Sequence, residues 1–146
     1  MENHSNERCT QLVKGELTVS IYRDSFVRIL QSSDIFLSMS GTAAEQAIGL
    51  GKPVIQLSGY GPQFTSSFAE AQRRLLGPTI FCADGKVGAE STLRKTAYLV
   101  LDVMHRFKND QTFARQCQLE SVRRLGPAGG GKKISGSISK LISQLP

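Results

Sequence analysis

Apolar and polar residues follow the periods of strands and helices along most of the chain. Residues 17–22 alternate and are rich in β-formers, which predicts a strand. Residues 35–39 are a near-continuous apolar run, as in a strand that is buried on both faces. Two further strands are predicted at 54–57 and 79–82. Residues 1–15 are polar and unpatterned, so we expect a loose leader there.

Helical spacing fills the intervals between these strands. A short helix is expected after Asp24, which can cap it, and a second helix at 43–50. Gly51 suits the C-cap of the second helix. The third helix is predicted by apolar residues that recur on one face, namely Phe64, Phe68, Ala71 and Leu75.

The part of the chain from Glu90 onward is predicted to be helical throughout. One helix begins at Glu90 and another covers 110–125. A terminal amphipathic helix at 132–146 carries its apolar residues at helical spacing, namely Ile134, Ile138, Leu141, Ile142 and Leu145.

The alternation of strands and helices predicts an α/β fold. We expect a Rossmann-like parallel sheet with right-handed crossovers and flanking helices in residues 16–146, followed by a helical C-terminal part. About four strands are few for a complete doubly wound domain, so the chain is expected to be part of a larger protein. In such sheets ligands bind at the carboxyl ends of the strands.

The amino-acid composition indicates which classes of molecule the chain could bind. The chain has 146 residues, of which 40% are hydrophobic, and 18 basic against 12 acidic residues give a net charge of +6. This balance favours an anionic partner. The basic pairs have no interleaved aromatic residues, so nucleic acid is not expected, whereas peripheral contact with anionic lipid headgroups is compatible with the charge.

Three widely spaced cysteines without a CxxC motif predict neither a disulfide framework nor a metal site. The chain shows neither an apolar run of membrane-spanning length nor the apolar core of a signal peptide. We therefore expect a cytoplasmic protein, at most peripheral to the inner face of the membrane.

The most informative segment joins the strand at 35–39 to its helix. Ser40, Gly41 and Thr42 form a tight turn with small side chains, so a ligand can approach the free amides of the first helical turn. These amides and the helix dipole favour phosphate, and Glu45 could accept hydrogen bonds from a ribose diol. The alternative is a capping box, in which Glu45 returns to the amide of Thr42.

A second glycine-rich turn follows the strand at 54–57. Gly59 and Gly61 allow a close backbone approach, and the amide of Gln63 can both donate to and accept from sugar hydroxyls. Taken alone, this segment fits an ordinary turn before a helix better than a binding loop. Because it lies at the carboxyl end of the next strand, we expect it beside the first turn.

Three segments in this order resemble a known family. They are SDIFL at 33–37, SGTAAE at 40–45 and GKPVI at 51–55, and GPQFTSSFAEAQRRLLG at 61–77 extends the likeness. The sequence is similar to the C-terminal, donor-binding half of GT-B glycosyltransferases. It most resembles proteins related to lipid-A-disaccharide synthase and, more distantly, MurG-like enzymes and UDP-sugar epimerases. The resemblance covers about residues 15–145.

The resemblance implies a site for a UDP-sugar donor, such as UDP-N-acetylglucosamine. Ser40, Gly41 and Thr42 would hold the diphosphate, and Glu45 or Gln46 the ribose. The remaining implied contacts are with the donor sugar, from Gly61, Gln63 and Phe64, and with the uracil, from Tyr22 and Arg23.

The activity implied by the resemblance is hexosyl transfer to a lipid or cell-envelope acceptor, without a metal or other cofactor. The general base and the acceptor site of such enzymes usually belong to an N-terminal domain, so no catalytic residue is assigned, and we expect the 146-residue chain to bind donor without transferring sugar. Two alternatives stay open. They are an epimerase-like or hydrolytic protein on the same scaffold, and a truncated, non-catalytic binding or partner domain.

Overall fold

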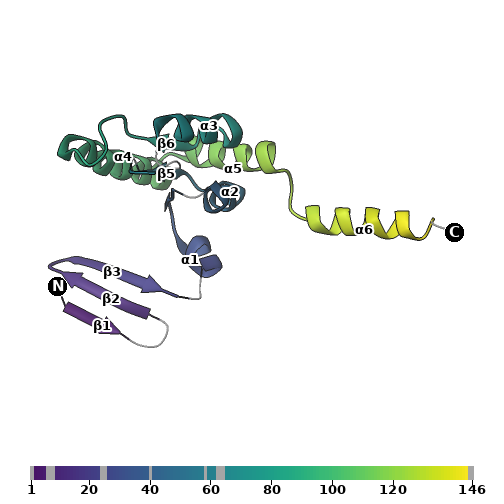
Figure 1. Cartoon of the computed structure of the whole chain (residues 1–146), viewed down its shortest axis with the longest axis horizontal. Coiled ribbons are helices and arrows are strands. Elements are labelled where there is room, and N and C mark those ends of the chain that lie inside the picture. Colours follow the sequence, from purple (N-terminus) through teal and green to yellow (C-terminus); the bar gives the residue numbers. More distant parts are fainter. Residues whose placement is uncertain are drawn as a thin grey trace. The chain divides into compact units, whose positions relative to one another are not determined.

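The computed structural model describes residues 2–5, 9–23, 26–39, 41–57, 59–61 and 65–144 (Figure 1). It forms two compact units, Met1–Ser33 and Asp34–Pro146, so the domain boundary expected between residues 15 and 16 is wrong. The elements are β1 (Glu2–Ser5), β2 (Cys9–Lys14), β3 (Leu17–Tyr22), α1 (Phe26–Ser32), β4 (Phe36–Leu37), α2 (Gly41–Gly49), β5 (Val54–Gln56), α3 (Ser66–Leu76), β6 (Ile80–Cys82), α4 (Glu90–Asn109), α5 (Gln111–Leu125) and α6 (Gly130–Ile142).

The first unit is an antiparallel sheet in the order β1-β2-β3, followed by α1. The loose leader expected at 1–15 is wrong, because β1 and β2 lie within it and pair from Glu2↔Val13 to Ser5↔Thr10. A two-residue turn of Gly15 and Glu16 joins β2 to β3. Gly15 has φ 59°, which a first turn residue of a type II′ hairpin needs and glycine adopts readily. The capping role predicted for Asp24 lies outside the described residues.

The second unit contains the parallel sheet that the sequence predicts, with three strands in the order β4-β5-β6. Phe36 pairs with Val54, and Val54 with Ile80. The α/β class is therefore correct. The expectation that the strand at 17–22 begins this sheet is wrong, because β3 pairs with β2 in the other unit.

The strand β4 is short and lies at an edge of the parallel sheet. Only Phe36 and Leu37 form it, although the apolar run extends over 35–39. Leu37 is 46% exposed, so the expectation of a strand buried on both faces is wrong here. Full burial is found instead in β5, the central strand, where Val54 and Ile55 are completely inaccessible.

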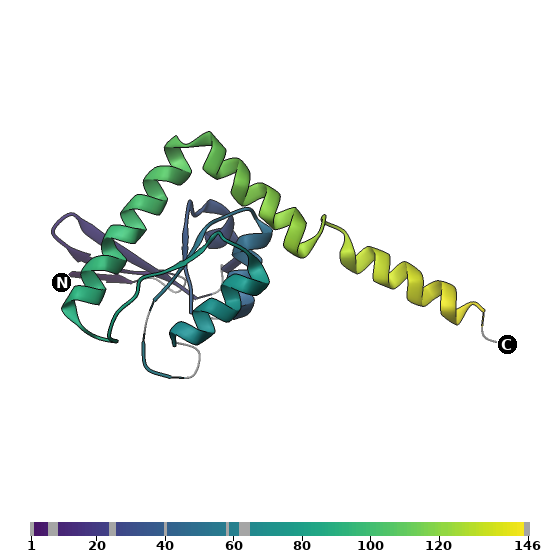
Figure 2. The same ribbon diagram turned by 90° about the horizontal axis from the view of Figure 1, so that it is seen from above.

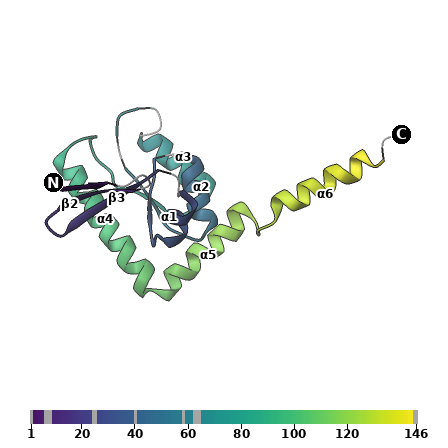
Figure 3. The same ribbon diagram turned by 90° about the horizontal axis from the view of Figure 1, so that it is seen from below.

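Helices cover both faces of this sheet. Ile55 packs with Val103 of α4 and with Phe113 and Cys117 of α5, whereas the next residue, Gln56, contacts α3. Because successive side chains of a strand point to opposite faces, α3 and the α4–α5 pair lie on opposite sides. Figures 2 and 3 show α4 and α5 as the two arms of a V.

The boundaries of the later helices agree with the sequence pattern, but two details differ. The apolar face expected on α3 is displaced, because Leu75 is exposed while Gln72 and Leu76 are buried, and Phe64 lies outside the described residues. The terminal helix expected at 132–146 begins earlier, at Gly130. Within the described ranges, no helix combines the length and the apolar character needed to cross a bilayer.

Candidate functional site

The N-terminal turn of α2 lies at the carboxyl edge of the parallel sheet. After β4, the amide of Ser38 donates to the carbonyl of Ile55 at 3.1 Å, which holds the strand exit against β5. The helix then begins at Gly41 and is anchored by Ala44, Ala47 and Ile48, all buried. The first amides of a helix have no partner within it, so this turn presents backbone donors and the positive end of the helix dipole.

Two buried glutamines lie behind this turn. Gln56 ends β5 and is 3% exposed, and Gln72 of α3 is 8% exposed. The Nε2 of Gln56 donates to the Oε1 of Gln72 at 3.4 Å, while the buried Oε1 of Gln56 has no hydrogen-bond partner among the residues that the structure describes. Burying an amide oxygen without a donor costs about 1–3 kcal/mol.

Gly41 connects the turn to this glutamine pair. A β-carbon built on Gly41 would lie 2.9 Å from the Nε2 of Gln72, closer than real β-carbons come to other atoms. The absence of a side chain at residue 41 thus lets α3 and the first turn of α2 approach each other. The backbone of Gly41 does not have a positive φ, so space, and not conformation, is what requires glycine here.

The other residues predicted in this segment lie on the same helix. Thr42 is the second residue of α2 and is exposed, which places it inside the helix and makes the capping box centred on it wrong. The side chain of Glu45 is half-buried and that of Gln46 exposed, one turn further along. The predicted diphosphate ligand Ser40 lies outside the described residues.

The turn after β5 lies beside the turn after β6. Tyr60 is exposed, and a β-carbon on Gly88 would lie 3.6 Å from its Oη, so the two turns approach each other at the carboxyl edge. Gly61 is exposed within this turn. Gln63 and Phe64, predicted to face the donor sugar, lie outside the described residues, so their roles stay predictions.

Tyr22 and Arg23 belong to the first unit. Both are exposed, at the end of β3 in the antiparallel sheet. Their predicted role rested on a place at the end of the first parallel strand, and that premise is wrong because β3 is not part of the parallel sheet. A strand pattern identifies a strand but does not identify its partner.

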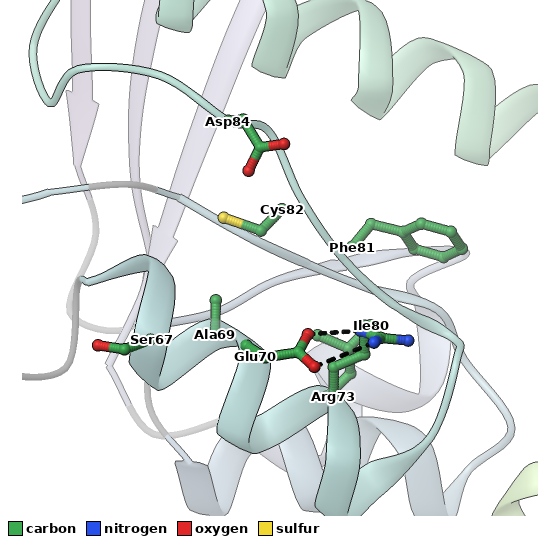
Figure 4. A pocket seen from close by; sticks show the side chains of 8 residues that line it. All are labelled: Ser67, Ala69, Glu70, Arg73, Ile80, Phe81, Cys82 and Asp84. Atoms are coloured by element: carbon green, nitrogen blue, oxygen red, sulfur yellow. Dashed lines mark hydrogen bonds and ion pairs between the residues drawn. The ribbon is translucent and has the colours of Figure 1, made fainter.

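A cavity that sequence reasoning missed lies between α3 and β6 (Figure 4). Its volume is about 510 Å³, and it is lined by Ser67, Ala69, Glu70 and Arg73 of α3 and by Ile80, Phe81, Cys82 and Asp84. Of the predicted donor-binding residues that the structure describes, none lines it. The only signal in the sequence is the i, i+3 spacing of Glu70 and Arg73 beside a strand that exits at Asp84.

Glu70 and Arg73 of this cavity form an ion pair, to which Arg74 adds a second arginine. The Nε of Arg73 lies 2.8 Å from Glu70 and that of Arg74 lies 3.0 Å from it. Hydrogen bonds, first from Arg73 and then from Arg74, lower the pKa of Glu70 to about 2. Glu70 thus offsets one of the two positive charges, and its carboxylate already occupies the hydrogen-bonding nitrogens of Arg73 that an anion would use.

The cavity also contains a thiol. Burial, and secondarily the carboxylate of Asp84, raise the pKa of Cys82 above its usual value. The thiol is therefore protonated at neutral pH and a poor nucleophile. Within the described ranges, no three His, Cys, Asp or Glu side chains come together as metal ligands would.

Comparisons of the chain with family models, with curated proteins and with solved structures found no match.

Proposed function

We propose that the second unit binds a nucleoside-diphosphate sugar as a Rossmann-like donor-binding domain of a glycosyltransferase. The diphosphate would bind at the first turn of α2. The observation that carries the proposal is that α2 begins with Gly41 at the carboxyl edge, where its first backbone amides are donors without partners inside the helix. The resemblance of segments 33–37, 40–45 and 51–55 to GT-B glycosyltransferases supports it.

The chemistry asked of this turn is stabilisation of negative charge. When the sugar leaves a nucleoside diphosphate, charge develops on the diphosphate, and preorganised amides at a helix N-terminus stabilise it. The exposed hydroxyl of Thr42 adds one donor, and Glu45 or Gln46 is placed one turn along to accept from ribose hydroxyls. These groups bind and orient the donor, whereas deprotonation of the acceptor hydroxyl needs a general base.

The proposed reaction is hexosyl transfer to a lipid or cell-envelope acceptor, with UDP-N-acetylglucosamine as the model donor. The resemblance implies that the base and the acceptor site come from a separate domain. We therefore expect the 146-residue chain to bind UDP and UDP-sugars and to show no transfer on its own. Sugar transfer catalysed by the purified chain would contradict this division of roles.

Thermal unfolding tests the binding. A ligand present at about 100 times its dissociation constant should add about 2.7 kcal/mol to the free energy of unfolding. UDP and UDP-N-acetylglucosamine are each expected to raise the midpoint in a saturable way, and by more than inorganic phosphate at equal ionic strength. The phosphate arm controls for general anion binding, since the chain carries +6. Equal shifts with all three ligands, or none with either nucleotide, would overturn the proposal.

A further inference from the structure

The helix α6 has no packing partner in its unit. None of its residues is buried, and in Figures 1 to 3 no other element of the second unit lies beside it. Its apolar side chains form one stripe at spacings of four, three and one residues, and each is at least 50% exposed, namely Ile134, Ile138, Leu141 and Ile142. This stripe is defined here as the α6 stripe. An apolar stripe of this kind is stable in water only when something covers it.

The opposite face of α6 is small and basic. Its polar positions hold serines, glycines and the three lysines Lys132, Lys133 and Lys140, and no acidic residue. Five of the 18 basic residues of the chain follow Glu120, and none of the 12 acidic ones does. Two of these five, Arg123 and Arg124, belong to α5 and pair with Glu120, so α6 itself carries three positive charges of the net +6 and no negative one.

We propose that α6 lies on the surface of an anionic lipid bilayer, with the α6 stripe among the acyl chains and its lysines at the headgroups. An amphipathic helix with an apolar face and a lysine-bearing polar face is the form that binds at this interface. Lysines near an anionic leaflet contribute favourably, and long lysine side chains reach the headgroups while their stems remain apolar.

The composition of α6 favours lipid over a protein partner. Protein interfaces are depleted of lysine and draw most of their binding energy from tryptophan, tyrosine and arginine, none of which occurs in α6. The helix is also short and contains Gly130, Gly131 and Gly136. Isolated helices of this length are marginal in water, so contact with a bilayer should increase the helicity of this segment. The inference concerns α6 alone and is independent of the donor site.

Co-sedimentation of the full chain with vesicles tests the proposal. We expect binding to vesicles of equimolar phosphatidylcholine and phosphatidylglycerol, little binding to pure phosphatidylcholine, a gain of helical circular dichroism on binding, and weakening by salt. Each lysine near the surface contributes about 1 kcal/mol, so one Lys→Gln change should weaken partitioning about five-fold. Replacing Lys132, Lys133 and Lys140 together should abolish binding.

Matched variants separate α6 from the rest of the chain. Lys14→Gln, Lys86→Gln and Lys95→Gln together remove the same charge outside α6 and should leave most of the binding intact. Ile138→Ala with Ile142→Ala shortens the α6 stripe and should lower partitioning at least about ten-fold, because each removed methylene counts about 0.8 kcal/mol when buried. The control for this double variant is Leu93→Ala with Leu101→Ala, at two exposed positions of α4, which should leave partitioning unchanged.

Three results would overturn the proposal. The first is equal binding to both kinds of vesicle. The second is equal loss in the α6 lysine variant and in its charge-matched control. The third is absence of binding to the anionic vesicles. If the chain then forms a dimer in sedimentation velocity that Ile138→Ala with Ile142→Ala dissociates, a second copy covers the α6 stripe instead.

Discussion

The helix α3 has two faces that differ in how their polar groups are compensated. On one face, Gln72 contacts Gly41 and Gln56, and an amide oxygen is left without a donor. On the other, Glu70 and Arg73 line a cavity and neutralise each other. The cavity therefore contains an arginine that is already ion-paired, while the amides of the α2 terminus have no partners within the helix. The difference teaches that an anion is better sought at the free backbone amides of a helix terminus than in a cavity whose arginine is already paired.

The C-terminal end of α3 fixes the position of the whole helix, and therefore of both of its faces. The first prediction concerns a substitution at this end. Gly77 has φ 100° and ψ −177°, and a β-carbon there would lie 2.6 Å from the Oε2 of Glu120, which is buried and holds Arg124 at 3.1 Å. Gly77→Ala should thus lower the free energy of unfolding by more than backbone strain alone, which costs about 1–3 kcal/mol. Urea unfolding measures the loss.

Gly126→Ala is the matched control for this variant. Gly126 ends α5 with φ 77° and ψ 175°, and nothing lies within 4 Å of a β-carbon built there. Gly126→Ala should show the backbone strain without the clash. The loss of unfolding free energy in Gly77→Ala should therefore exceed that in Gly126→Ala by about 1 kcal/mol or more, the cost of disturbing a buried hydrogen-bonded group. Equal losses in the two variants would mean that Glu120 does not constrain the end of α3.

The second prediction concerns the cavity face alone. Arg73→Gln removes the stronger hydrogen bond to Glu70 and should raise the pKa of Glu70 from about 2 toward its ordinary 4.5, by roughly 1 unit or more. Arg74→Gln should raise the pKa less. Nuclear magnetic resonance titration of the Glu70 carboxyl measures both. Because the folded pKa is lowered, the ion pair stabilises the fold above about pH 4.5 and loses this contribution as the pH falls toward 2.

The same variant sharpens the contrast between the two faces. If the donor binds at α2, Arg73→Gln should leave the affinity for UDP within about two-fold of the wild-type value, because Arg73 is already paired. A loss of about ten-fold would instead move the anion site into the cavity.

The third and smallest predicted effect is on the thiol of the cavity. Asp84→Asn removes a negative charge that raises the pKa of Cys82, so reaction with a disulfide reagent at neutral pH should become roughly two- to three-fold faster. A Cys9→Ser background isolates the signal, because burial raises the pKa of Cys117 to about 11 and keeps it inert. The exposed Asp102→Asn is the control, and the same acceleration there would contradict a local effect of Asp84.

The sequence predicts a structural feature well where residues close in the chain determine it, and poorly where residues far apart in the chain determine it. The starts of α4 and α5 follow from local periodicity and from Asp110, whose Oδ1 accepts from the amides of Thr112 and Phe113. The strand at 17–22 pairs through the Gly15 turn with a segment that is polar and shows no alternation of apolar residues. The apolar pattern therefore did not reveal this partner, and the strand was assigned to the wrong sheet.

The candidate site shows the same division. Gly41 at the start of a helix can be read from one segment, because small residues follow an apolar run. The burial of Gln72 cannot, because it depends on Gln56, 16 residues away, and polar residues on a helix are ordinarily assigned to the exposed face. The cavity needs the packing of α3 against β6, which no single segment encodes.

Calorimetric titration of the Gly41→Val variant with UDP tests the central claim most directly. We expect the branched side chain to crowd the first turn of α2 and hinder approach to its amides. Its β-carbon would clash with the end of the Gln72 side chain, which can move, so the variant should fold. Gly41→Val with Gln72→Ala relieves the clash and controls for any loss of packing. We predict that both variants unfold cooperatively and bind UDP at least about ten-fold more weakly than the wild type, a loss of about 1.4 kcal/mol. Unchanged UDP affinity in the folded Gly41→Val protein would contradict a diphosphate site at the first turn of α2.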